Sequence, residues 1–99
     1  MPAYVVVEVR ITDPERAARY AAASPATVER YGGRYLARGG AISALEGGWD
    51  PKRLVVIEFP SIERVREWYR SPEYAEVRKL REGAGEWRVV AVEGVDPRR

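Results

Sequence analysis

The chain repeats one strand-and-helix pattern in its two halves. The segment VVEV at 6–9 corresponds to VIEF at 56–59, and ERA at 15–17 corresponds to ERV at 63–65. With 99 residues there is room for two βαβ units in one domain. Two such units form the ferredoxin-like split βαβ plan (βαββαβ): an α+β fold with a four-stranded antiparallel sheet and helices on one face. We expect this domain over residues 1–95, followed by a short polar tail at 96–99.

Apolar alternation, capping residues and breakers indicate where the elements lie. Strands are predicted at 4–11, 34–38, 54–59 and 87–93, with the second continuing over 41–46 after a bend at Gly39 and Gly40. Helices are predicted after the N-cap residues Asp13, Ser61 and Ser71, and Pro25 predicts that the first is kinked or divided in two. The plan further predicts that strands one and three are parallel neighbours at the sheet centre.

One face of the predicted sheet has no helical cover. The wholly apolar strand faces, such as Val5, Val7 and Val9, suit the covered side. The open face would then carry Tyr4, Val6, Leu54, Val56, Trp87 and Val89 beside Glu8 and Glu58. A patch of this kind in water promotes association, and packing two sheets face to face removes it. We therefore expect a homodimer.

The composition argues against several kinds of site and partner. The chain has no cysteine or histidine, so we expect no metal and no bound cofactor. Its net charge is +2 with both signs interleaved, and its third strand lacks paired stacking aromatics, which argues against nucleic-acid binding. No apolar run has the length of a membrane span and no secretory signal is recognisable, which favours a cytoplasmic protein. Charge richness without Asn or Gln is typical of a thermostable protein, or of a GC-rich genome.

Four short motifs together resemble one family. They are YGGRYLARGG at 31–40, LEG at 45–47, EFPS at 58–61, and WYxSxxY at 68–74 leading to Arg78. The chain is similar over nearly its whole length to the domain of unknown function 1330 family, in the dimeric α/β-barrel superfamily. The resemblance implies a ferredoxin-like dimer and no particular reaction. More distant superfamily members include cofactor-independent monooxygenases, muconolactone isomerases and haem-handling enzymes. Many of them rely on Asn, Trp or His, and here only Trp68 offers a counterpart.

Glu8 and Glu58 are the first candidate site, because each interrupts an apolar strand. The repeat predicts that they lie on adjacent central strands and point to the open face. Two close carboxylates raise one another's pKa and can act as a catalytic acid/base pair. Arg38 is predicted to join them from the second strand. The alternative is a Glu–Arg ion pair that closes the dimer interface.

A second candidate site is a pocket between the helices and the sheet. Trp68 would form an apolar wall, Tyr74 and Arg78 would orient an anion at the mouth, and Tyr35 would contribute from the strand side. The alternative is that these aromatic residues belong to the core. Two functions follow: the chain binds or converts a small, partly apolar metabolite, anionic or neutral, or it is a non-catalytic module for dimerisation or ligand sensing.

Overall fold

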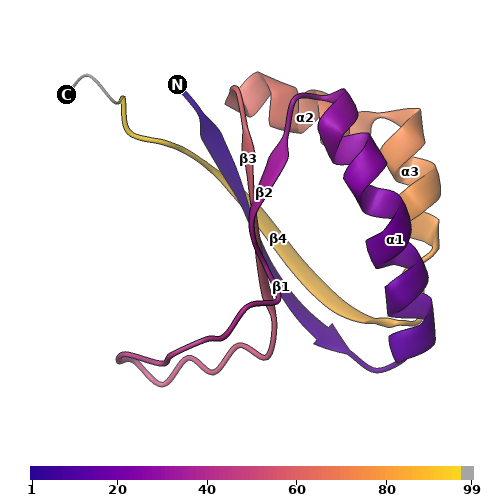
Figure 1. Ribbon diagram of the computed structural model, residues 1–99, viewed down its shortest axis with the longest axis vertical. Coiled ribbons are helices and arrows are strands. Elements are labelled where there is room, and N and C mark those ends of the chain that lie inside the picture. The colour runs from indigo at the N-terminus through magenta and orange to yellow at the C-terminus, as the bar shows by residue number, and fades with distance from the viewer. Residues whose placement is uncertain (97–99) are drawn as a thin grey trace.

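The computed structural model describes residues 1–96 and shows one antiparallel sheet with three helices on one of its faces (Figure 1). Along the chain the elements are β1 (Ala3–Ile11), α1 (Pro14–Arg30), β2 (Arg34–Arg38), β3 (Leu54–Phe59), α2 (Ile62–Arg70), α3 (Pro72–Lys79) and β4 (Gly85–Glu93). The strand order is β2-β3-β1-β4. This is the predicted ferredoxin-like plan. Apart from Asp96, the predicted polar tail lies outside the described residues.

The helices begin where the capping residues predict. The side chains of Asp13, Ser61 and Ser71 accept hydrogen bonds from backbone N–H groups in the first turns of α1, α2 and α3. Each such cap satisfies a donor that has no partner within its helix. Helix α1, however, runs for 17 residues with Pro25 inside it, so the prediction of a two-part helix is wrong. No helix of residues 1–96 is long and apolar enough to cross a membrane.

Two predictions about the strands are also wrong. β1 and β3 are antiparallel, because β3 lies between two strands that a helical crossover makes parallel to each other. The second strand does not continue over 41–46: residues 39–53 form a loop without helix or strand. In Figure 1 this loop extends away from the helices. The loop is rich in glycine and almost all of its residues are exposed, so it lacks the buried apolar side chains that stabilise a strand in a sheet.

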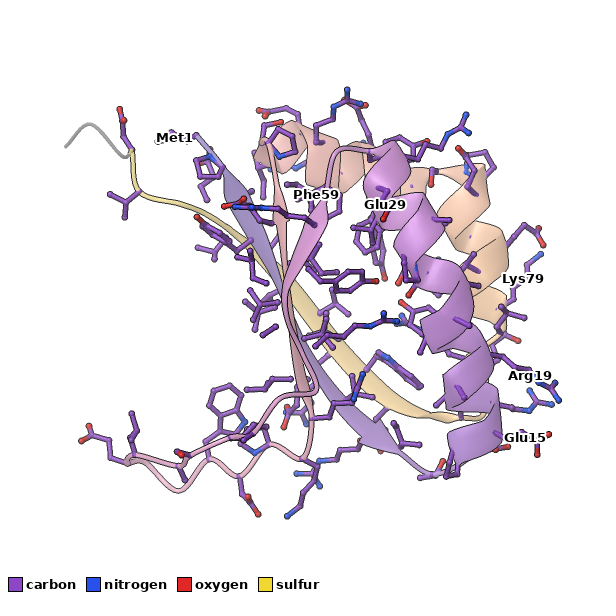
Figure 2. The ribbon with its side chains drawn as sticks, in the orientation of Figure 1. Met1, Glu15, Arg19, Glu29, Phe59 and Lys79 are labelled. Atoms are coloured by element: carbon purple, nitrogen blue, oxygen red, sulfur yellow. The ribbon has the colours of Figure 1, made fainter. Side chains whose placement is uncertain are left out.

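The helix-covered face of the sheet holds the core. Ala3, Val5, Val7 and Val9 are buried there, together with Ile57 and Phe59, and Figure 2 shows Phe59 between the sheet and the helices. The predicted faces of β4 are reversed. Trp87 and Val89 pair with Val9 and Val7, so they lie on the covered face and not on the open one. The open face of β4 instead presents Val90 and Val92, whose exposed fractions are 65% and 55%.

Candidate functional site

A cavity of about 260 Å³ lies between α1 and the covered face of the sheet. Its floor is aliphatic and consists of Val7, Val9, Val55, Ile57 and Val89. These residues come from the three neighbouring strands β3, β1 and β4, whose inward side chains alternate along each strand. The sheet therefore supplies an apolar surface on which a small molecule can lie.

The space exists because α1 presents small residues to the sheet. Ala17, Ala21 and Ser24 recur at helical spacing on the side that lines the cavity. Leucines at these positions would reach the strands and fill the gap, as they do in a closely packed helix–sheet interface. The larger side chain on this face, Tyr20, lies against the ring of Trp87, with ring centres 5.8 Å apart. The cavity is thus a consequence of residue size along one helix.

Trp68 and Tyr74 both line the cavity. The prediction placed Tyr74 at the mouth with Arg78, whereas the structure places it beside Trp68 in the buried wall. The exposed fractions of Trp68 and Tyr74 are 2% and 1%, and their ring centres are 4.2 Å apart. The indole N–H of Trp68 donates to the hydroxyl of Thr27 at 3.0 Å. Both rings also belong to the hydrophobic core, which is the structural alternative. Their role in binding a ligand stays a prediction.

Hydroxyl groups from three elements face each other at the cavity. The Tyr20 and Tyr74 hydroxyls are 2.6 Å apart, and those of Ser24 and Tyr35 are 3.2 Å apart. Burial raises the pKa of the Tyr20 hydroxyl above its ordinary value, and burial followed by the neighbouring Tyr20 raises the pKa of Tyr74 further. Both phenols therefore keep their protons at neutral pH, and either hydroxyl can donate to the other.

Arg38 lines this cavity and does not join Glu58, which corrects the prediction. A bulge between Tyr35 and Ala37 shifts the register, so Arg38 lies opposite Val55 and faces the helices. There its guanidinium donates to the backbone carbonyl of Ala21 and lies 4.6 Å from the ring centre of Tyr35. Tyr35 lines the cavity from the strand side, and its role in binding a ligand stays a prediction.

Glu8 and Glu58 share the open face but do not form a pair. The antiparallel register places Glu58 opposite Tyr4 and Glu8 opposite Leu54, four positions further along β1, or roughly 13 Å. Arg34 binds Glu58, with Nε and Oε1 2.8 Å apart. The carboxylate of Glu8 lies 4.0 Å from the guanidinium of Arg88. It also accepts a hydrogen bond from the indole N–H of Trp49, in the 39–53 loop, at 3.4 Å. The predicted coupling between the two carboxylates is wrong. Glu58 does form an ion pair, but with Arg34 and not Arg38, and a role of that pair in closing a dimer interface stays a prediction.

Arg78 lies outside the cavity, with its guanidinium 4.8 Å from the ring centre of Tyr69. The polar groups that sequence analysis missed are Tyr20, Ser24, Arg53 and Arg81, all of which line the cavity. The alternation of β3 could have identified Arg53, because it precedes the inward residues Val55 and Ile57 by two and four positions. Arg81 follows α3, where no periodicity fixes its direction.

The residues that line the cavity include no aspartate or glutamate. Within residues 1–96, no cluster of three or more His, Cys, Asp or Glu side chains could hold a metal ion. The site consequently offers cations, protonated hydroxyls and an apolar floor.

Comparison with known proteins supports this fold. The structure of RPA0582, a protein of unknown function from Rhodopseudomonas palustris, is 25% identical with a TM-score of 0.77, and the match covers 97% of this chain and 84% of that one. SnoaB, a cofactor-independent oxygenase from Streptomyces nogalater, is 11% identical with a TM-score of 0.66 over 96% and 94% of the two chains. A dimeric ferredoxin-like protein of unknown function from Thermobifida fusca is 14% identical with a TM-score of 0.60 over 93% and 90%.

No curated protein matches the chain. The family described as "Domain of unknown function (DUF1330)" matches residues 2–95, which is nearly the whole sequence. The match includes all four motifs that carried the resemblance. The chain belongs to the DUF1330 family.

Proposed function

We propose that this protein binds a compact, partly apolar small molecule in the cavity between α1 and the sheet. The observation that carries the proposal is an aliphatic floor faced by convergent hydroxyl and guanidinium groups. Ligand sites in proteins commonly combine apolar walls with a few placed polar groups.

The size of the cavity limits the ligand. At the liquid volume of water, 260 Å³ holds about nine molecules, so the fit is to one substituted ring or a short branched chain. The lining residues offer no carboxylate or imidazole that could take up a proton, and the phenols are protonated. This favours binding over an acid/base conversion that needs a general base from the protein.

The test compares the parent protein with a variant whose cavity is filled. Ala21→Leu adds a side chain into the space, whereas Ala22→Leu makes the same change at the neighbouring, exposed position of α1. Each protein is purified from the same host, and small molecules released by denaturation are identified by mass spectrometry. We expect a compound that accompanies the parent and Ala22→Leu but not Ala21→Leu. Identical profiles for all three proteins would contradict the proposal.

The open face of the sheet favours a second proposal, that the protein is a homodimer. Val6 and Val56 pair at the centre of this face, and Val90 and Val92 lie beside them, largely exposed. The loop at 39–53 adds Trp49, which donates to Glu8 of this face and has an exposed fraction of 59%. A second copy placed face to face would cover this apolar strip by twofold symmetry. In the alternative function, dimerisation or ligand sensing without catalysis, this face would be the working surface.

Sedimentation velocity tests the homodimer. We expect the parent at micromolar concentration to sediment with twice the chain mass, and Val56→Asp to sediment as a monomer because a buried, unpaired carboxylate is costly. Ala22→Asp, on the exposed side of α1, adds the same charge as a control and should leave the dimer intact. A monomeric parent would overturn the proposal.

A further inference from the structure

Three arginines line the cavity: Arg38 at the end of β2, Arg53 just before β3, and Arg81 just after α3. Since no acidic residue lines it, positive charge dominates the space. Beside aliphatic walls the charge is screened less than it would be in water. The interior of the cavity is therefore electrostatically suited to an anion.

None of the three cavity arginines forms an ion pair within residues 1–96. Arg38 bonds to a backbone carbonyl, and Arg81 donates to the Tyr20 hydroxyl at 3.4 Å and lies 5.0 Å from the ring centre of Trp87. Within residues 1–96 the ion pairs involve other cations, namely Arg16, Arg19, Arg30, Arg34, Lys52, Arg64, Lys79 and Arg88. The charge of the three cavity arginines is left for a ligand.

Arg38 and Arg53 lie together at the β2–β3 end of the cavity. The N–H of Gly39 donates to the carbonyl of Leu54 at 3.0 Å, which holds the two strand ends side by side. A Cβ atom on Gly39 would overlap the Arg53 guanidinium, so the glycine leaves the space that this group occupies. Arg81 is on the opposite flank, because its partner Trp87 belongs to β4, at the other edge of the sheet.

We propose that the ligand is a compact apolar carboxylate, with its carboxylate between Arg38 and Arg53 and its apolar body on the valine floor. The inference rests on the proposed function and adds the charge and orientation of the ligand. A guanidinium fork matches the two oxygens of a carboxylate.

Calorimetric titration with trans-cinnamate and with cinnamamide tests the charge directly, because the two probes share a carbon skeleton. We expect the parent to bind cinnamate roughly tenfold or more tightly, since hydrogen bonds to ionised groups are the strong ones. The double variant Arg38→Gln/Arg53→Gln should lose this preference and keep its affinity for cinnamamide. Arg19→Gln is the matched control: Arg19 points away from the sheet on α1 (Figure 2) and should change neither affinity.

Each outcome has a distinct meaning. Equal affinities in the parent would refute the carboxylate while leaving the cavity as a binding site. A preference that survives in the double variant would refute the assignment to Arg38 and Arg53. No binding of either probe by the parent would count against the proposed function as well. If the double variant does not fold, the two probes are titrated into the parent protein at rising salt concentration. Added salt must weaken the binding of cinnamate and not that of cinnamamide.

Discussion

The hydroxyl groups of Tyr20 and Tyr74 have different numbers of partners, so we expect Tyr20→Phe and Tyr74→Phe to lower stability by different amounts. Within residues 1–96 the Tyr74 hydroxyl bonds only to Tyr20, whereas the Tyr20 hydroxyl also accepts from Arg81. Tyr20→Phe therefore leaves a buried donor without its partner. Tyr74→Phe leaves a Tyr20 hydroxyl that still has Arg81. We expect the first change to be the more harmful, although each removes one oxygen atom.

The magnitudes follow from burial. With Tyr74 at 1% exposure, its orphaned hydroxyl should lower the free energy of unfolding by about 1–3 kcal/mol in Tyr20→Phe. Water that enters the adjoining cavity replaces part of the lost bond, which favours the lower part of that range. Tyr74→Phe should cost about 0.5–1.5 kcal/mol. The double variant removes both polar groups, so it should be no less stable than Tyr20→Phe alone.

Urea unfolding followed by circular dichroism measures the four proteins. All must be compared at one protein concentration, because the proposed dimerisation would make the measured stability depend on concentration. A difference of 1 kcal/mol corresponds to roughly 4–8 °C in melting temperature for a domain of this size, so thermal melts give an independent check. Additive losses in the double variant, or equal losses in the two single variants, would refute the reasoning about the unpaired hydroxyl.

Two other predictions concern pH and the open face. Because the pKa values of Tyr20 and Tyr74 are raised, the unfolded chain loses these protons near pH 10 while the folded protein keeps them. The free energy of unfolding should thus be unaffected by this pair below about pH 9 and fall above about pH 10, less steeply in the double Phe variant, as urea titrations at each pH would show. Glu58→Gln should lower stability by about 1 kcal/mol or less, because Arg34 is largely exposed, and should leave cinnamate affinity unchanged; lost affinity would restore Glu58 as a site residue.

The sequence predicted the elements because each carried a local signal. Asp13, Ser61 and Ser71 cap three helices, and Pro14 and Pro72 stand at the first positions of α1 and α3. Hydrophobic alternation placed Val5, Val7 and Val9 on one face. Such signals depend only on near neighbours in the chain, and they agree with the final fold here.

The faces of β2 and β4 could not be read in the same way. β4 has apolar residues at both parities, since Trp87 and Val89 alternate with Val90 and Val92, and only its pairing with β1 selects the inner set. In a regular strand Tyr35 and Arg38, three positions apart, would point to opposite faces. The bulge in β2 puts both on the covered face. Parallel strands would set Glu8 beside Glu58, and the antiparallel pairing of β1 with β3 separates them. Thermostability and a cytoplasmic location rest on composition and stay predictions.

The two local irregularities of the fold meet at one place. Pro25 has no N–H to give to the carbonyl of Ala21, four residues earlier in α1, so that carbonyl lacks its usual helical partner. The bulge in β2 turns Arg38 toward α1, and its guanidinium donates to this same carbonyl. A regular helix would consume the acceptor, and a regular strand would turn Arg38 to the open face. Departures from regular structure that serve packing poorly tend to persist where function needs them. That both place one arginine beside an apolar cavity supports a ligand-binding role for this corner of the fold.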